Sequence, residues 1–164
     1  MPELSTLQRA QRDAEEGKAP STQAGEFVRE EIHHVREGEH GARSSKQAIA
    51  IGLSKARRAG VKLPPPRKGR SSDAIRRQAT RDLAKAGSRH KVSRKRSRAT
   101  LNALRREGHG AASHEQLGAQ ARSSSRRRGP ADRHRASMQA VRTKGPAGLR
   151  RAARKAATTR RRSR

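Results

Sequence analysis

Large apolar side chains are concentrated in one short stretch of this chain, residues 26–66, and that limits what can fold. The stretch holds the single phenylalanine, Phe27, and the chain has no tryptophan, tyrosine or cysteine. Burial of large apolar side chains has to offset an ordering cost of about 1–2 kcal/mol per residue. Such side chains are scarce after Leu63. We therefore predict one small core and a long remainder without a core of its own.

Two helices are predicted within the apolar stretch, over residues 22–37 and 45–59. Each has apolar residues three and four positions apart, the spacing of one helical face. Gly38 ends the first helix, and Ser44 or Ser45 caps the second. The predicted shared core consists of Phe27, Val28, Ile32, Val35, Ile49, Leu53, Val61 and Leu63. A core of this size is marginal, so a partner or a homodimer formed through the helical hairpin is expected to complete it.

The predicted organisation is mostly α, with three segments. Residues 1–21 form a flexible lead-in, and residues 22–66 form a small helical domain that ends in a proline-rich linker. Residues 67–164 form a basic tail rich in arginine, alanine and serine. Short helical units recur in the tail, but each has too few large apolar residues to pack. We therefore expect an N-terminal helical hairpin followed by a long basic tail that is largely disordered or transiently helical.

The charge is divided very unevenly along the chain. The formal net charge is +28; residues 1–40 hold nine acids and five bases, whereas residues 41–164 hold five acids and 37 bases. So dense a positive charge repels itself unless a polyanion screens it. The sequence therefore predicts non-enzymatic, largely sequence-independent nucleic-acid binding. Double-stranded DNA is the favoured ligand, in a nucleoid-associated or compaction role.

The candidate phosphate contacts are the bases of the second predicted helix and four basic clusters further along the chain. Lysine and arginine side chains neutralise phosphates and release counterions. The predicted nucleic-acid-binding residues are Lys46, Lys55, Arg57, Arg58, Arg67, Lys68, Arg70, Arg94, Lys95, Arg96, Arg98, Arg126, Arg127, Arg128, Arg160, Arg161 and Arg162.

Three other functions fit the same features, and they differ in the ligand that the chain would bind. The chain is an RNA- or ribosome-associated basic protein if structured RNA outcompetes duplex DNA. It is a protein-interaction module if residues 1–66 alone capture a specific partner. Sequence-specific reading would place the helix over residues 44–60 in the major groove, but its apolar faces take up most of its circumference. Stacking on single strands is excluded, because it needs aromatic side chains.

No catalytic, cofactor or metal site is predicted. The chain lacks a glycine-rich phosphate loop and a nucleophile elbow, so we expect neither an enzyme nor a small-molecule substrate. His33, His34 and His40 lie near Glu30 and Glu37, but they do not form a zinc-binding H-E-x-x-H motif and show no fourth ligand. We interpret them as surface histidines. No apolar run of membrane-spanning length and no secretory signal is present, so a cytoplasmic protein is expected.

Two segments of the apolar stretch resemble a known family. They are Glu30-Glu31-Ile32-His33-His34-Val35-Arg36-Glu37-Gly38 and the run from Ser45 to Gly60, which fits K-Q-A-I-A-I-(A/G)-L-S-x-A-(R/K)-(R/K)-A-G. This pattern is similar to that of small basic bacterial proteins with a domain of unknown function, some of them labelled DNA-binding. The resemblance implies a bacterial source and a short helical domain, without catalytic residues. The tail is similar in composition to bacterial histone-H1-like proteins.

Overall fold

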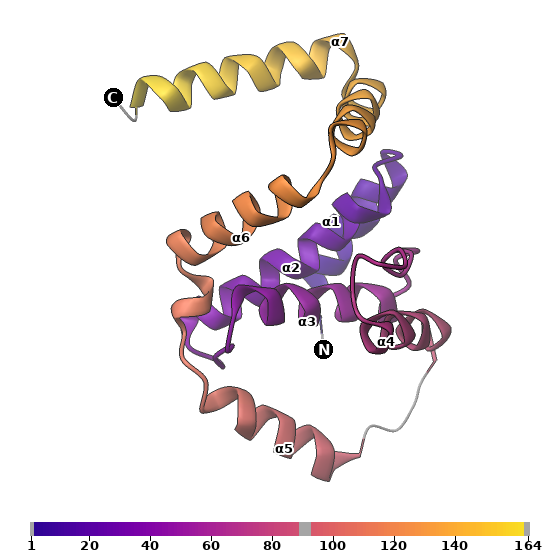
Figure 1. Ribbon diagram of the computed structural model, residues 1–164, viewed down its shortest axis with the longest axis vertical. Coiled ribbons are helices and arrows are strands. Elements are labelled where there is room, and N and C mark those ends of the chain that lie inside the picture. Colours follow the sequence, from indigo (N-terminus) through magenta and orange to yellow (C-terminus); the bar gives the residue numbers. More distant parts are fainter. Residues whose placement is uncertain (1, 89–92, 163–164) are drawn as a thin grey trace. The chain divides into compact units, whose positions relative to one another are not determined.

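The computed structural model describes residues 2–88 and 93–162, and 75% of these residues are helical. No strand is assigned in this described part, so the prediction of a mostly α protein is confirmed (Figure 1). None of the helices in the same residues combines the length and apolar character needed to cross a bilayer. The elements are α1 (Leu4–Glu15), α2 (Pro20–Glu37), α3 (Ser45–Arg58), α4 (Asp73–Ala84), α5 (Arg94–Arg105), the 3-10 helix η1 (Gly110–Ala112), α6 (His114–Arg127) and α7 (Pro130–Arg162).

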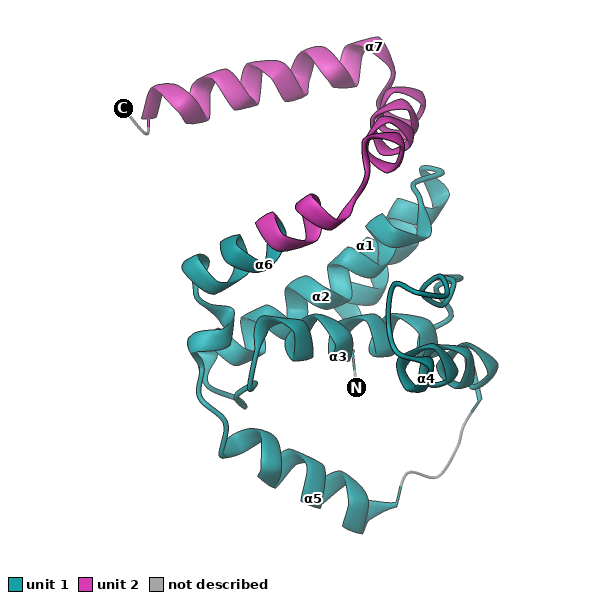
Figure 2. Ribbon diagram, in the orientation of Figure 1, with its two compact units in different colours: residues 1–121 teal, residues 122–164 magenta. Residues whose placement is uncertain are grey.

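The chain divides into two compact units, residues 1–121 and residues 122–164 (Figure 2). The first unit contains α1 to α5, η1 and the beginning of α6. The second contains the end of α6 and all of α7. Both buried hydrophobic clusters belong to the first unit.

The two helices predicted in the apolar stretch are α2 and α3, which pack against each other. Gly38 ends α2 with a φ of 80°, a conformation that favours glycine. The Ser44 side chain accepts a hydrogen bond from the Gln47 amide and caps α3. The helices approach so closely at Gly52 that a Cβ there would lie 2.7 Å from the Cα of Val28. The pair is therefore held at backbone contact distance.

The predicted flexible lead-in is instead helix α1, which packs on α2. Thr6 and Ala10 are buried at 0% and 6% exposure. Arg9 Nε lies 2.6 Å from Glu26 Oε2 and ties the two helices together at the edge of the contact. The prediction was wrong because it looked for large apolar side chains, whereas this contact is made by small side chains and a partly buried ion pair.

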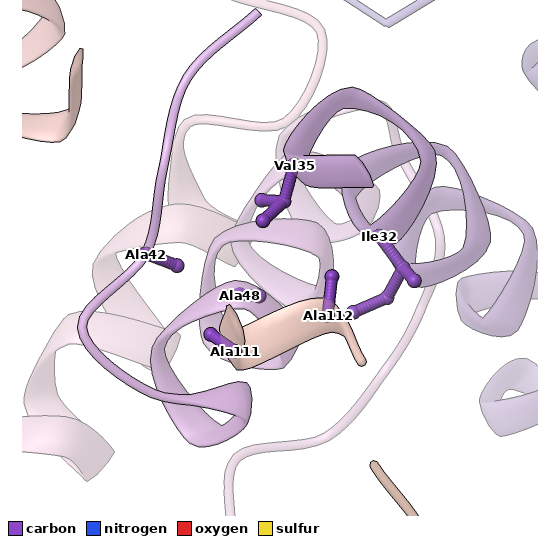
Figure 3. Close-up of a cluster of buried hydrophobic side chains, with 6 residues drawn as sticks. All are labelled: Ile32, Val35, Ala42, Ala48, Ala111 and Ala112. Atoms are coloured by element: carbon purple, nitrogen blue, oxygen red, sulfur yellow. The ribbon is translucent and has the colours of Figure 1, made fainter. Parts of the chain in front are cut away.

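The core consists of two hydrophobic clusters. Every residue of the predicted core except Ile49 is buried in one of them or packs against one. One cluster joins α1, α2 and α3 and contains Ala10, Ala24, Phe27, Ala56 and Val61. The other, drawn in Figure 3, contains Ile32, Val35, Ala42, Ala48, Ala111 and Ala112. Alanine therefore supplies much of the core, so the helices can pack closely.

The predicted layout of a hairpin followed by a disordered tail is wrong. Ala111 and Ala112 come from the predicted tail, yet they fill the cluster between α2 and α3 (Figure 3). Ser45 Oγ donates to the Ala111 carbonyl at 2.6 Å, and Arg36 Nε donates to the Ala112 carbonyl at 2.8 Å. The helical domain thus needs η1, which follows it by some fifty residues, to complete its core.

Backbone hydrogen bonds also hold the residues before η1 against the connection between α2 and α3. The Gly41 amide donates to the Leu104 carbonyl at 2.9 Å, and the Ala42 amide donates to the Gly108 carbonyl at 3.1 Å. A Cβ on Gly41 would lie 1.8 Å from the Glu107 carbonyl oxygen, so only glycine fits. These contacts do not depend on large apolar residues, which is why hydrophobicity alone did not predict them.

The helical units predicted in the tail occur as α4 to α7, and they are helices in the free chain. Ser72 and Ser93 cap α4 and α5 with their side-chain oxygens. Gly145, with φ 60° and ψ 178°, breaks α7 into helical stretches over 130–144 and 146–162.

Candidate nucleic-acid interface

The few acids of the basic half are largely engaged with bases of the same chain. The observed ion pairs are Asp73 with Arg76, Asp82 with Arg58, and Asp132 with Arg135. Residues 41–164 carry 37 bases against five acids. Internal pairing can therefore neutralise only a small part of the positive charge, and the remainder stands on exposed helix faces.

The two lysines of α3 that were predicted to contact phosphate have different environments. Lys46 is exposed in the first turn of the helix. Lys55 is 25% exposed, and its Nζ lies 2.7 Å from Glu31 Oε2 and 3.6 Å from Glu30 Oε1. The charge of Lys55 is thus directed at two buried carboxylates. The structure leaves Lys46 as the outward-facing member of this pair.

The other two predicted contacts in α3 support the fold. Arg57 is 7% exposed; its Nε donates to the Leu63 carbonyl at 3.1 Å and its Nη2 donates to the Pro64 carbonyl at 3.4 Å. Burial lowers the pKa of the Arg57 guanidinium, and the nearby Asp82 carboxylate partly opposes that shift. Arg58 Nε donates to Asp82 at 2.9 Å. Phosphate binding by these two arginines stays a prediction.

A basic hollow of about 580 Å³ lies along α4. Its α4 residues are spaced three and four apart and so form one face, while Ala79 and Asp82 are buried on the opposite side. Of the bases that line the hollow, only Lys68 was predicted to contact phosphate. Arg76, Arg77 and Arg81 were missed, although their spacing on one helical face could have indicated them. The hollow is lined by Lys68, Asp73, Arg76, Arg77, Thr80 and Arg81.

The remaining predicted clusters lie on exposed positions. Arg67 and Arg70 belong to the turn before α4, and the others belong to α5, the end of α6 and the end of α7. Arg127 also donates to Ser123 Oγ at 3.1 Å within α6. The exposed members are Arg67, Arg70, Arg94, Lys95, Arg96, Arg98, Arg126, Arg127, Arg128, Arg160, Arg161 and Arg162.

The first turn of α5 places cations where a helix prefers anions. Arg94, Lys95 and Arg96 directly follow the Ser93 cap, and this turn holds no acid. The positive end of the helix dipole disfavours cations here by about 0.3–1 kcal/mol each at low salt. A bound anion would gain from both the dipole and the side chains, so this turn is a favourable place for a phosphate.

The second stretch of α7 has one basic face. At about 100° per residue, its bases except Arg160 fall within roughly 140° of the helix circumference, and alanines occupy the other side. All of these side chains are exposed. We call this set the α7 basic face; it consists of Arg150, Arg151, Arg154, Lys155, Arg161 and Arg162.

Of His33, His34 and His40, which were all predicted to lie on the surface, only His33 does. The side chain of His33 is 64% exposed and lies 2.9 Å from Glu37 Oε1. His40 is buried, and the side chain of His34 is only 12% exposed. A hydrogen bond between His34 Nε2 and Glu3 Oε1, at 3.3 Å, lowers the pKa of the Glu3 carboxyl.

The chain matches a model of a family of unknown function, DUF6496, over residues 19–68. This segment spans α2, α3 and the proline-rich linker, so the resemblance to a family without an assigned function is confirmed at that level. No curated protein and no solved structure matches the chain. The matched family brings no activity with it, and α4 to α7 lie outside the matched residues.

Proposed function

We propose that this protein binds nucleic acid through the phosphate backbone, largely without regard to sequence. The observation that supports the proposal is the exposure of the bases of α5 and α7 on helices that contain almost no acid: α5 has none, and Asp132 of α7 is paired with Arg135. The bases of α5 and α7 thus far outnumber the acids within these two helices. A polyanion supplies the missing negative charge and gains entropy from released counterions.

Three surfaces contribute contacts of different kinds. The first turn of α5 offers a helix N-terminus together with cationic side chains. The basic hollow along α4 offers arginines and a lysine around a concave surface. The α7 basic face offers bases spread over one broad side of a helix. None of these contacts reads base edges, so they support affinity and positioning rather than sequence selection.

Duplex DNA is the ligand we favour, with compaction at the bacterial nucleoid as the role. The sole aromatic side chain, Phe27, is 1% exposed and cannot stack on a base. Single strands, which are held by aromatic platforms, therefore gain little from this surface. Structured RNA presents the same phosphates, so competition between duplex DNA and folded RNA for the full-length chain distinguishes the two ligands.

A salt titration of duplex binding tests the proposal. For six to ten phosphate contacts, affinity should fall by about 10³–10⁵ between 50 and 200 mM salt. Two duplexes of unrelated sequence should give the same curve within a few-fold. A shallow slope with strong preference for one duplex would contradict the proposal and favour a sequence-reading helix.

A further inference from the structure

A buried carboxylate and two histidines converge where α2 ends. Glu31 and His34 lie one turn apart on α2, and His40 follows in the connection to α3. One ligand atom from each of the three lies within 4.8 Å of the others. The side chains are 1%, 12% and 10% exposed, respectively. The three residues therefore form a compact and largely dry polar cluster, which we call the Glu31 cluster.

The buried carboxylates of Glu30 and Glu31 carry more negative charge than the groups around them compensate. Neither oxygen of Glu31 makes a hydrogen bond within the described residues, and Glu30 Oε1 likewise makes none. The single ammonium of Lys55 lies 2.7 Å from Glu31 and 3.6 Å from Glu30. One cation thus serves two buried carboxylates. An uncompensated buried charge is costly, so this position favours a further cation.

The orientation of the His40 ring also favours a bound cation. Its Nδ1 lies 3.0 Å from the Gly41 carbonyl oxygen, so Nδ1 carries the proton and donates there. In the neutral ring Nε2 then presents a lone pair, and it lies 3.3 Å from Glu31 Oε1. Two acceptors face each other, and a cation between them would bind both. A histidine that donates its second ring nitrogen to a backbone carbonyl is the usual arrangement at metal sites.

We propose that the Glu31 cluster binds a divalent transition-metal ion of the zinc class. Two imidazoles and a carboxylate suit Zn²⁺, with bond lengths of about 2.0–2.2 Å. Tetrahedral ligands at these lengths are roughly 3.3 Å apart, which is the separation of His40 Nε2 and Glu31 Oε1. His34 ligates through Nδ1, because its Nε2 lies 3.3 Å from Glu3 Oε1.

The bound ion would stabilise the contact between the segment around α5 and the α2–α3 pair. His40 directly precedes Gly41 and Ala42, whose amides hold the carbonyls of Leu104 and Gly108. A metal bond from His40 to α2 fixes this connection. The site therefore goes beyond nucleic-acid binding, since it governs how firmly the segment around α5 is held on α2 and α3.

Titration of the full-length chain with ZnCl₂ tests the proposal by calorimetry. We expect one tight equivalent, with affinity reduced about 100-fold or more in His34→Gln and in His40→Gln. His33→Gln is the matched control, because this exposed neighbour has the same chemistry but lies outside the cluster. Its affinity should stay within about twofold of that of the parent chain. Equal loss in all three variants would overturn the proposal and indicate surface histidines.

Two measurements on the unsubstituted chain remain informative even if a variant fails to fold. Co²⁺ should give the intense visible absorption bands of a tetrahedral ion, and Zn²⁺ should displace them. Zn²⁺ should also raise the Tm, because it binds the folded state only. If neither the bands nor the Tm shift appears, the cluster is an ion pair between Glu31 and a protonated His40, and the metal proposal is wrong.

Discussion

At the scale of single residues, the missing side chain of Gly52 sets how closely α2 and α3 pack. A Cβ at this position would lie 2.7 Å from Val28 Cα and 2.9 Å from the Phe27 carbonyl oxygen. Both are backbone atoms, so the clash cannot be relieved by a rotamer change. Gly25, which lies inside α2, is exposed and has nothing within 4 Å of such a Cβ.

The two glycines should therefore respond to alanine in opposite directions. Gly52→Ala should destabilise the chain by about 1–3 kcal/mol, because overpacking outweighs the better helix propensity. Gly25→Ala should stabilise it by up to about 1 kcal/mol. Urea unfolding followed by circular dichroism measures both. Equal stabilisation by the two substitutions would show that the helices are not in backbone contact at Gly52.

The buried guanidinium of Arg57 gives a second residue-scale prediction. Arg57→Gln should cost about 1–3 kcal/mol, because the Leu63 carbonyl loses its donor in a buried setting. Lys46→Gln, on the exposed first turn of the same helix, should change stability by no more than about 0.5 kcal/mol. The same urea experiment compares them. If the Arg57 variant is as stable as the Lys46 variant, Arg57 does not support the fold.

At the scale of elements, η1 is the unexpected part of the core. Ala112 is 0% exposed, and the residues around it make hydrogen bonds to Ser45 and Arg36. Ala112→Gln should destabilise the chain by about 1–3 kcal/mol, since the longer polar side chain does not fit. Ala119→Gln, on the exposed side of α6, should be nearly neutral. A neutral Ala112 variant would mean that η1 does not dock on α2 and α3.

The sequence was sufficient to predict α2 and α3 because their large apolar residues repeat with helical spacing. The docking of η1 could not be predicted, because alanine side chains and backbone hydrogen bonds carry little hydrophobic signal. For the same reason His40 was expected on the surface: nothing local indicated that residues about seventy positions later would help to cover it.

The sequence was enough to predict which part of the chain carries the candidate nucleic-acid site. It was much less informative about which residues form it. Charge density alone identified the basic half. The fold then separated the bases by role: Lys55, Arg57 and Arg58 face buried or acidic groups, whereas Arg77 and Arg81 of the α4 hollow are exposed. This distinction depends on which helical face packs, and composition does not contain that information.

At the scale of the whole molecule, the uneven charge is the property that the account explains. Residues 1–40 carry a small acidic excess and hold much of the helical core, while residues 41–164 carry an excess of 32 positive charges. On the α7 basic face, bases four residues apart repel one another by a few tenths of a kcal/mol per pair. Phosphates bound along this face would relieve that repulsion, so ligand binding and helix stability are coupled.

The most direct test compares two versions of the α7 basic face in the full-length chain. In the first, its six bases are replaced by glutamine; in the second, its five arginines are replaced by lysine, so the charge is kept. Both preserve helix propensity. The account predicts that the glutamine version binds duplex DNA more weakly and that its salt slope falls by about 0.9 per lost contact, while the lysine version stays close to the parent chain. Identical salt slopes for the glutamine version and the parent chain would contradict the account.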